Sequence, residues 1–326
     1  MSAGGQIVKW LHWPAFGIVT AWLLLCLVIG IVATESALHP GRRGVTGADR
    51  ERAFDLAAAN NARMSEVSIP AADGVVLRAW SIVPNSANGD AVMLLHGQAD
   101  NRAGMLGSAA LLLRHGYAVL LPDARAHGES GGLIATYGVL EAEDLRRWFV
   151  WVQQSEHPRC IDGVGDSMGA AELLRSLDAE HGYCAVIAES VFSNFREVAY
   201  IRLGEWFGTS PWLGRTLLRP AVDIGFVYAR LRYGVNFAEA SPIRAVAATS
   251  TPILLIHGLA DSNISPSQSE KIKLRHPSAE LWEPPNADHC GASSTDPAGY
   301  ESHVLGFLAA HDVPRSLAKS ENSLMR

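Results

Sequence analysis

The stretch GVGDSMGA at residues 163–170 places two side chains that could attack a carbon centre next to each other, Asp166 and Ser167. The neighbouring glycines distinguish them, because Gly165 and Gly169 flank Ser167 in the spacing G-x-S-x-G. The positions that would have to be glycine for Asp166 to be the centre hold valine and methionine. The pattern predicts Ser167 as a nucleophile, and we interpret Asp166 as a solvated or helix-capping carboxylate.

A serine hydroxyl is a weak nucleophile at neutral pH and needs a base within hydrogen-bond reach. In the G-x-S-x-G pattern the serine lies on a sharp turn from a strand into a helix, and the N–H after it can stabilise an oxyanion. The apolar run CIDGVG precedes Ser167 and a helix-compatible segment follows it, which is the expected context. The pentapeptide alone is common by chance, so its partners must be sought downstream.

If Ser167 belongs to a catalytic triad of this type, an acid and then a histidine should follow along the chain. Asp261 comes after the apolar run PILLIHG, and His289 lies in a loop after the run AELWEP. Both therefore follow expected strands, as Ser167 does. Glu189, at the end of another apolar run, and Asp288, beside His289, are less favoured alternatives for the acid.

These motifs resemble those of α/β-hydrolase-fold serine hydrolases, in particular members that carry an N-terminal transmembrane helix. The similarity covers roughly residues 65–312. HGQADNR resembles the oxyanion loop, DARAHGES the D-x-R-G-H-G-x-S segment, HGLADSNISP the acid loop and DH the histidine loop. Ala126 stands where the second motif usually has glycine, a departure that could alter a local turn but removes no catalytic group.

The resemblance implies that His289 takes the proton of Ser167 and later donates it to the leaving group, while Asp261 holds the imidazole tautomer. It also implies an oxyanion hole made of backbone N–H groups. The expected site consists of the catalytic Ser167, Asp261 and His289, the oxyanion-hole N–H groups of Gln98 and Met168, and the elbow and loop glycines Gly97, Gly165 and Gly169.

Three further histidines are interpreted as structural. His96 and His257 both precede glycine at strand ends, and His127 belongs to a loop motif. Neither the 12 histidines nor the 4 cysteines show the spacing of a metal site, and we expect no metal or cofactor.

Short apolar runs alternate with longer amphipathic ones along most of the chain. Asp73 and Gly74 separate two expected strands, which is a strong hairpin signal. The later Val/Ile/Leu runs, separated by helical segments, are typical of a parallel sheet covered on both faces. The resemblance implies an α/β-hydrolase fold with a mostly parallel eight-stranded sheet, helices on both faces and a small helical cap.

Residues 14–33 form an uncharged apolar run. At 1.5 Å per residue this run would cross a hydrocarbon layer of about 30 Å. It predicts an N-terminal membrane anchor over 1–33, with a cleaved signal peptide or a buried core helix as alternatives. The positive-inside rule would place the large domain in the cytoplasm, but long domains can cross regardless, so we leave the side open. The basic residues just after the run are Arg42, Arg43, Arg50 and Arg52.

The remaining boundaries follow from composition. A polar connector is expected over 34–64, the hydrolase domain over 65–312 and a polar tail over 313–326. Within the domain, about 192–242 contains no strand run and is rich in aromatic residues. This predicts a helical cap over the C-terminal edge of the sheet, with an ordinary packed insertion as the alternative.

Charge and cysteine content limit the partners. The formal charge is −6 and no basic patch stands out, so nucleic acid is not an expected partner. Cys160 and Cys184 begin strands that would be neighbours. Two free buried cysteines are the default interpretation, and a disulfide, which would favour an extracytoplasmic domain, is the alternative.

The sequence therefore predicts a single-pass membrane-anchored serine hydrolase that cleaves a small-molecule acyl ester through an acyl-enzyme, as a carboxylesterase or lipase does. The anchor and the aromatic residues of 192–242 favour a lipophilic acyl chain. The alternatives are a prolyl-oligopeptidase-like peptidase, a thioesterase and an acyltransferase. A non-enzymatic binding module is disfavoured, because all three triad residue types occur in the expected order.

Overall fold

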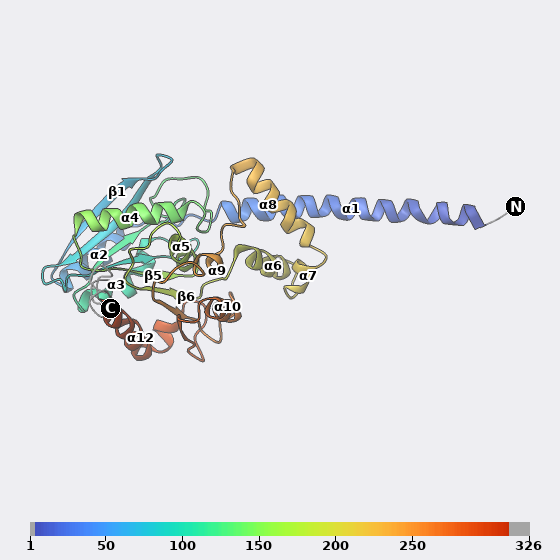
Figure 1. Ribbon diagram of the computed structural model, residues 1–326. Helices are drawn as coiled ribbons and strands as arrows, with labels where there is room; N and C mark the ends of the chain where they lie inside the picture. The colour runs from blue at the N-terminus through green and yellow to red at the C-terminus, as the bar shows by residue number, and fades with distance from the viewer. Residues whose placement is uncertain (1–3, 313–326) are drawn as a thin grey trace, which may run out of the picture. The chain divides into compact units, whose positions relative to one another are not determined.

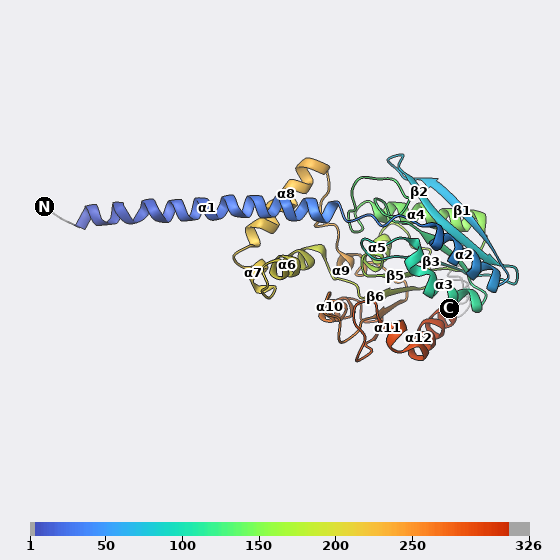
Figure 2. The ribbon, with the colours of Figure 1, turned by 180° about the vertical axis from the view of Figure 1, so that it is seen from behind.

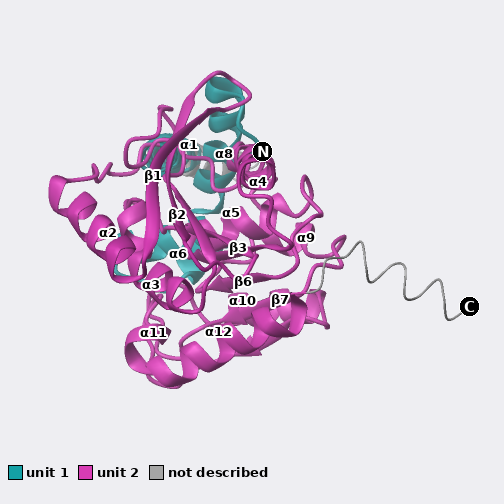
Figure 3. Cartoon of the chain, turned by 90° about the vertical axis from the view of Figure 1, so that its left-hand side faces the viewer, with its two compact units in different colours: residues 1–38, 196–238 teal, residues 39–195, 239–326 magenta. Residues whose placement is uncertain are grey.

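A computed structural model describes the backbone of residues 4–312 and the side chains of residues 16–312. The predicted polar tail, 313–326, lies outside the described residues. The chain divides into two compact units (Figure 3). Unit 1 consists of residues 1–38 and 196–238, and unit 2 of residues 39–195 and 239–326.

Unit 2 is built around an eight-stranded sheet with the strand order β1-β2-β4-β3-β5-β6-β7-β8 (Figure 1). Strand β2 is antiparallel to both neighbours and the other pairs are parallel, so the sheet is mostly parallel, as predicted. The strands are β1 Ala62–Pro70, β2 Val76–Pro84, β3 Ala91–Leu95, β4 Ala118–Pro122, β5 Ile161–Asp166, β6 Val186–Glu189, β7 Ile253–Ile256 and β8 Glu280–Trp282.

Helices connect these strands and cover both faces of the sheet (Figures 1 and 2). The helices of unit 2 are α2 Gly47–Ala59, the 3-10 helix η1 Arg102–Met105, α3 Leu106–Arg114, α4 Glu141–Ser155, α5 Met168–Ser176, α9 Pro242–Ala245, α10 Ser267–Arg275, α11 Ala292–Thr295 and α12 Pro297–His311.

Successive residues of the central strands face opposite helical layers. Val164 on β5 packs into the core shared with α2, α3 and α12. Its neighbour Gly163 faces the other way, since a Cβ there would lie 2.6 Å from Cδ1 of Leu173 on α5. Strands β3, β6 and β7 are buried along their whole length, which explains their uninterrupted apolar sequences.

All regular elements in the described part of unit 1 are helices. The unit contains α1 Gly4–Leu38, α7 Trp212–Arg215, α8 Arg219–Tyr233 and nearly all of α6 Phe195–Trp206. Residues Phe16–Leu38 of α1 are long and apolar enough to cross a membrane, judged by length and composition. Only 11% of the most apolar window is buried, which argues against the buried core helix among the sequence-based alternatives.

The expected connector, 34–64, contains more regular structure than its polar composition suggested. Helix α1 continues to Leu38, α2 occupies Gly47–Ala59, and β1 begins at Ala62. Helix α2 starts with a capping box, in which the Thr46 hydroxyl accepts from the Asp49 N–H and the Asp49 carboxylate accepts from the Thr46 N–H.

The four arginines that follow the apolar run all have partners within unit 2. Their place in the sequence therefore has a structural explanation that does not involve membrane orientation. Arg42 donates to the carbonyl oxygens of Ala126 and Ser130, Arg43 pairs with Asp49 and Asp100, Arg50 with Glu66 and Glu129, and Arg52 with Asp49.

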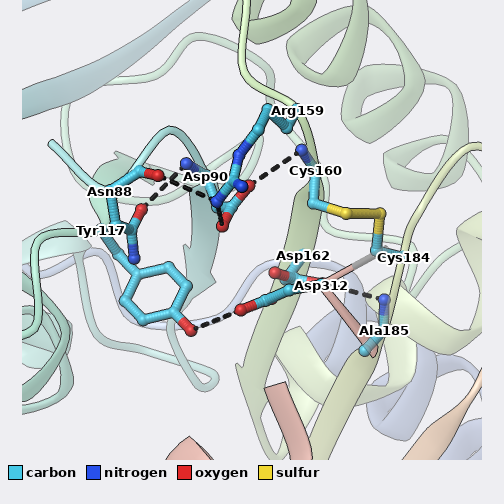
Figure 4. The surroundings of a disulfide bond; sticks show 9 residues. All are labelled: Asn88, Asp90, Tyr117, Arg159, Cys160, Asp162, Cys184, Ala185 and Asp312. Carbon is cyan, nitrogen blue, oxygen red and sulfur yellow. Dashed lines mark hydrogen bonds and ion pairs between the residues drawn. A yellow bond between two sulfur atoms is a disulfide. The ribbon is translucent and has the colours of Figure 1, made fainter. Parts of the chain in front are cut away.

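Cys160 and Cys184 form a disulfide, with sulfur atoms 2.15 Å apart and Cα atoms 5.7 Å apart (Figure 4). The default interpretation of two free cysteines was therefore wrong, and the alternative is confirmed. The bond joins the residue before β5 to the approach of β6. A second link lies beside it, because the N–H of Ala185 donates to Asp162 Oδ1 on β5 at 2.9 Å. Both links tie together the two strands that end at the candidate site.

Candidate active site

Ser167 lies on a sharp turn between β5 and α5. Its φ of 53° and ψ of −108° place it in a region that residues other than glycine rarely adopt. The flanking glycines permit this turn. A Cβ on Gly165 would lie 2.7 Å from the Ala170 nitrogen, and one on Gly169 would lie 2.4 Å from the Leu95 carbonyl oxygen. The strand, turn and helix around Ser167 agree with the sequence prediction.

The structure brings Ser167, His289 and Asp261 together from three separate strand ends. His289 Nε2 lies 2.9 Å from Ser167 Oγ, and His289 Nδ1 lies 2.9 Å from Asp261 Oδ2. Ser167 follows β5, Asp261 follows β7 and His289 follows β8. The two imidazole nitrogens therefore contact the hydroxyl and the carboxylate in the order that general-base activation of a serine requires.

The Asp261 side chain is fully buried and well supplied with donors. Its Oδ1 accepts from the backbone N–H groups of Asn263 (2.9 Å) and Ile264 (2.8 Å). Burial alone would raise the pKa of Asp261. Hydrogen bonds from His257, His289 and the Ile264 N–H outweigh it and hold the pKa well below its usual range. Asp261 is thus kept as the carboxylate, the form that can orient an imidazole.

His257 holds the loop that carries Asp261. It is fully buried, with Nδ1 2.7 Å from Ser269 Oγ and Nε2 2.8 Å from the Ile264 carbonyl oxygen. His257 Nε2 also lies 3.3 Å from Asp261 Oδ2. The structural role predicted for His257 is confirmed.

The loop of His289 is held by the end of β6, a support that the sequence did not reveal. The N–H of Cys290 donates to Ser190 Oγ at 3.0 Å, and the N–H of Ala292 donates to Glu189 Oε1 at 3.0 Å. Glu189, considered as an alternative acid, thus contacts the backbone of the histidine loop, while Asp261 is the carboxylate hydrogen-bonded to His289. Asp288, the other alternative, is exposed and accepts from Ser262.

Asp166 differs from its sequence-based interpretation. Its Oδ1 is buried without a hydrogen-bond partner among the described residues, and no side chain caps the start of α5. Burial, and then the nearby carboxylate of Glu189, raises the pKa of Asp166 well above its usual range. Asp166 as a whole is half-buried, but one of its oxygens is enclosed by the protein, which the identity of the residue did not indicate.

The expected oxyanion segments adjoin Ser167. A Cβ on Gly97 would lie 3.7 Å from Ser167 Cβ, so the backbone of Gly97 passes beside the Ser167 side chain. The Gln98 side chain donates to the Tyr137 hydroxyl at 2.9 Å, and this bond ties the loop after β3 to a second segment of unit 2. Met168 begins α5 directly after the serine. The role of the Gln98 and Met168 N–H groups as oxyanion donors stays a prediction.

The segment DARAHGES forms a tight loop around the buried carboxylate of Asp123. This side chain accepts from the N–H groups of Arg102 (2.8 Å) and Glu129 (2.7 Å). Ala126, which replaces the usual glycine, keeps a positive φ of 60°. The departure from the motif therefore preserves the turn, at the steric cost that a Cβ brings in this region.

His96 and His127 have the structural roles that were expected of them. His96 Nε2 accepts from the Ala124 N–H at 3.1 Å. His127 is fully buried, and its Nδ1 lies 3.0 Å from the Arg125 carbonyl oxygen.

The sheet order, the covering helices and the elbow together define an α/β-hydrolase fold. A family model described as the alpha/beta hydrolase family matches residues 92–301, and the chain belongs to this family. It is similar to the uncharacterized protein YqkD of Bacillus subtilis, with 29% identity over 245 residues, or 74% of this chain and 77% of YqkD. The uncharacterized protein YfhR of Escherichia coli K12 is 26% identical over 260 residues, covering 77% of this chain and 82% of YfhR.

Solved structures agree on the fold. The Pyrococcus furiosus esterase Pf2001 superposes with a TM-score of 0.65 at 24% identity, over 84% of this chain and 100% of that one. A puromycin-hydrolyzing peptidase of Mycobacterium tuberculosis gives a TM-score of 0.62 at 16% identity, over 78% of this chain and 40% of the peptidase. At these identities the esterase and peptidase neighbours show the fold alone, and the family rests on the match of the family model.

Proposed function

We propose that this hydrolase is a membrane-anchored serine esterase that works through an acyl-enzyme, with Ser167, His289 and Asp261 as its catalytic triad. The observation that carries the proposal is the unbroken series of contacts from Asp261 through His289 to Ser167, each 2.9 Å long. The strained elbow, which presents the serine at the start of a helix, supports it.

In the proposed reaction, Ser167 Oγ attacks the carbonyl carbon of the ester while its proton passes to His289 Nε2. The resulting oxyanion accepts hydrogen bonds from the N–H groups of Met168 and Gln98. When the intermediate collapses, the alcohol leaves with the proton from His289 and the acyl group stays on Ser167. Water then attacks the acyl-enzyme, giving its proton to His289, and release of the acid returns that proton to Ser167.

A fluorophosphonate probe tests the nucleophile on the full-length protein. We expect it to label the wild-type protein at Ser167 and to leave the Ser167→Ala variant unlabelled. The Ser68→Ala variant is the matched control, because Ser68 is an exposed serine on β1. Labelling that persists in Ser167→Ala would show that the nucleophile is another residue.

A small-molecule ester with a lipophilic acyl chain is the proposed substrate, and a peptide is the second candidate. The ester is favoured by the Pf2001 esterase, which matches over its full length. The peptide is favoured by the acylaminoacyl and puromycin-hydrolyzing peptidases among the structural neighbours. p-Nitrophenyl esters of increasing chain length, measured beside peptide p-nitroanilides, separate the two. Faster turnover of the anilides, or of acetate over longer esters, would reject the lipophilic ester.

Thioester hydrolysis and acyl transfer use the same kind of acyl-enzyme as ester hydrolysis. Thioester hydrolysis differs in its leaving group, a thiol, and acyl transfer differs in its acceptor, an alcohol instead of water. Acyl thioesters offered beside the matching oxygen esters test the first. Product analysis in the presence of a competing alcohol tests the second, since a transferase would form the new ester instead of the free acid.

The membrane part of the proposal places Phe16–Leu38 across a bilayer and unit 2 on the extracytoplasmic side. The Cys160–Cys184 disulfide supports this side, because such bonds persist in oxidising compartments. The arginines after the span, which would favour the opposite side, are engaged within unit 2. Protease added to sealed cells should digest unit 2. Protection of unit 2 until the membrane is opened would reverse the orientation.

A further inference from the structure

Helices α1 and α8 of unit 1 approach each other through small residues. Cys26, Gly30 and Thr34 recur every fourth position on α1. A Cβ on Gly30 would lie 2.4 Å from the Ala221 carbonyl oxygen, and one on Gly225 would lie 2.5 Å from Thr34 Oγ1. Small residues at four-residue spacing, which let two helix backbones touch, are typical of helices that pack within bilayers.

The contact extends over much of the apolar length of α1. At one end the indole N–H of Trp22 donates to the Leu217 carbonyl oxygen at 3.1 Å. At the other end the Glu35 carboxylate accepts from the hydroxyls of Tyr228 (2.6 Å) and Tyr233 (2.8 Å). Thirteen residues at 1.5 Å per residue separate Trp22 from Glu35, which is about 20 Å. Figures 1 and 2 show α8 beside α1 over this stretch.

This length matters because a hydrocarbon layer is only about 30 Å thick. Glu35 would mark the polar boundary if the apolar part of α1 spans the bilayer. Helix α8 would then lie beside α1 to a depth of about 20 Å from that boundary. The α6–α8 segment, residues 196–238, would then be partly inside the membrane.

The charges of the α6–α8 segment fit such a location. It carries six arginines against two glutamates and one aspartate, a formal charge of +3 in a chain whose total is −6. Each carboxylate has a cationic partner: Glu197 pairs with Arg215, Glu205 with Arg202, and Asp223 with Arg196. Charged groups near a hydrocarbon layer are tolerated when they are paired, and an excess of arginine favours anionic lipid headgroups.

An exposed apolar edge lies at the Trp22 end of this contact. Trp206, Phe207, Trp212 and Leu217 are 52%, 50%, 61% and 54% exposed. They lie between the end of α6 and the start of α8. Through Leu217 this edge meets α1 at Trp22, where α1 itself exposes leucine and valine side chains. A cluster of exposed large apolar side chains next to a membrane helix is an expected lipid contact.

We infer that the α6–α8 segment is embedded beside α1 in a bilayer that contains anionic phospholipids. Trp206, Phe207, Trp212 and Leu217 contact the acyl chains, and the excess arginines contact the headgroups. This inference rests on the membrane part of the proposed function and extends it, since the lipid contact is then made by two separate parts of the chain.

Photo-crosslinking of the full-length protein in lipid nanodiscs tests the inference. The probe is a phosphatidylcholine with a diazirine on its acyl chain, and the labelled peptides are mapped by mass spectrometry. We expect adducts in α1 and also across residues 203–219, severalfold more per residue than at the exposed leucines of unit 2, Leu133 and Leu274. Adding phosphatidylglycerol should increase the adducts of 203–219 further.

The outcomes separate the two proposals. Adducts in α1 without adducts in 203–219 would overturn the inference and leave the membrane anchor intact. An absence of adducts in both would overturn the anchor itself, while fluorophosphonate labelling of Ser167 would still report on the triad. Adducts of 203–219 that do not respond to phosphatidylglycerol would reject the anionic-lipid part.

A matched pair of variants sharpens the test. The triple variant Trp206→Gln, Phe207→Gln and Trp212→Gln should lose most adducts of 203–219 and keep those of α1. The control is Leu133→Gln with Leu274→Gln, which removes exposed apolar side chains from unit 2. Amide hydrogen exchange of α8 shows whether the triple variant still folds. Unchanged adducts with α8 still protected would overturn the inference.

Discussion

The two units are held by different kinds of contact. At the site edge of unit 2, side-chain oxygens bind backbone N–H groups of distant loops, as Glu189 binds Ala292 and Ser190 binds Cys290. In unit 1, α1 and α8 touch through residues with almost no side chain, such as Gly30 and Gly225. The first kind of contact fixes single atoms, and the second fixes only the distance between two helices.

The difference follows from what each unit must do. In the proposed reaction, proton transfer between Ser167 and His289 requires the two atoms to stay within hydrogen-bond distance, so every loop that carries them needs its own anchor. If α1 crosses a membrane as proposed, packing beside it requires close approach, with few polar groups left unpaired. Substitutions in unit 2 should therefore act through geometry and charge, and those in unit 1 through packing.

The largest effect is expected at the buried carboxylate of the triad. Asp261→Asn should lower kcat for an ester by about 10⁴, because the amide favours the wrong imidazole tautomer. Initial rates on a p-nitrophenyl ester measure this loss. The control is Asp288→Asn, which changes an exposed acid next to His289. An equal loss in the control would mean that the acid is misassigned.

A buried histidine of unit 2 should give a large effect on stability. Burial, and then the neighbouring His96, lowers the pKa of His127 to about 4. In an unfolded chain the value is about 6.5, so the unfolded state takes up the proton first as the pH falls. The free energy of unfolding should therefore decrease by about 2–3 kcal/mol between pH 7 and pH 4.5 from this residue.

Denaturant unfolding of the full-length protein in detergent, at both pH values, measures this loss. His127→Asn keeps a donor for the Arg125 carbonyl oxygen and should reduce the pH dependence by that amount. His303→Asn changes an exposed histidine and should leave it unaltered. The same pH dependence in wild type and His127→Asn would show that His127 does not carry the effect.

The sequence was most informative where function requires a local pattern. Ser167, Asp261 and His289 each follow an apolar run. Because the carboxyl ends of parallel strands lie at the same edge of a sheet, their meeting there could be predicted. The strained turn at Ser167 could be predicted because Gly165 and Gly169 are needed for it. These features depend on near neighbours in the chain.

Contacts between distant segments could not be predicted in this way. Ser190 meets the Cys290 N–H across one hundred residues, and no local pattern marks it. The four-residue spacing of Ala221, Gly225 and Ala229 is visible in the sequence, but nothing in it identifies α1 as the partner. The disulfide was ambiguous because neighbouring strands allow a bond without requiring it.

A moderate effect is expected at the helix contact of unit 1. Gly30→Leu places a side chain where a Cβ would lie 2.4 Å from the Ala221 carbonyl oxygen. Overpacking of this kind typically costs about 1–3 kcal/mol, which should appear as faster amide exchange in α8. Gly17→Leu is the matched control, because no heavy atom lies within 4 Å of a Cβ there. Equal exchange in both variants would contradict the close packing of α1 and α8.

The smallest effect on activity is expected at Ser190, whose hydrogen bond could either position His289 or only stabilise the fold. Ser190→Ala removes one hydrogen bond to the histidine loop, while Glu189 still holds the loop at Ala292. A single hydrogen bond contributes about 1 kcal/mol, so we expect kcat to fall about fivefold. If Ser190 positions His289, KM should stay unchanged and the Ser167 hydroxyl should react more slowly with a fluorophosphonate.

A purely structural role for Ser190 predicts a different result. The fraction of active protein and the unfolding midpoint would fall, while each remaining active site would react at the wild-type rate. Titration of active sites with the fluorophosphonate distinguishes the two, because it counts reactive serines separately from their rate. A normal rate per site would show that the Ser190 hydrogen bond contributes only to stability, as the packing contacts of unit 1 do. The proposed difference between the two units would then not hold for this bond. A slowed rate per site would confirm that one bond between distant segments of unit 2 acts on the chemistry.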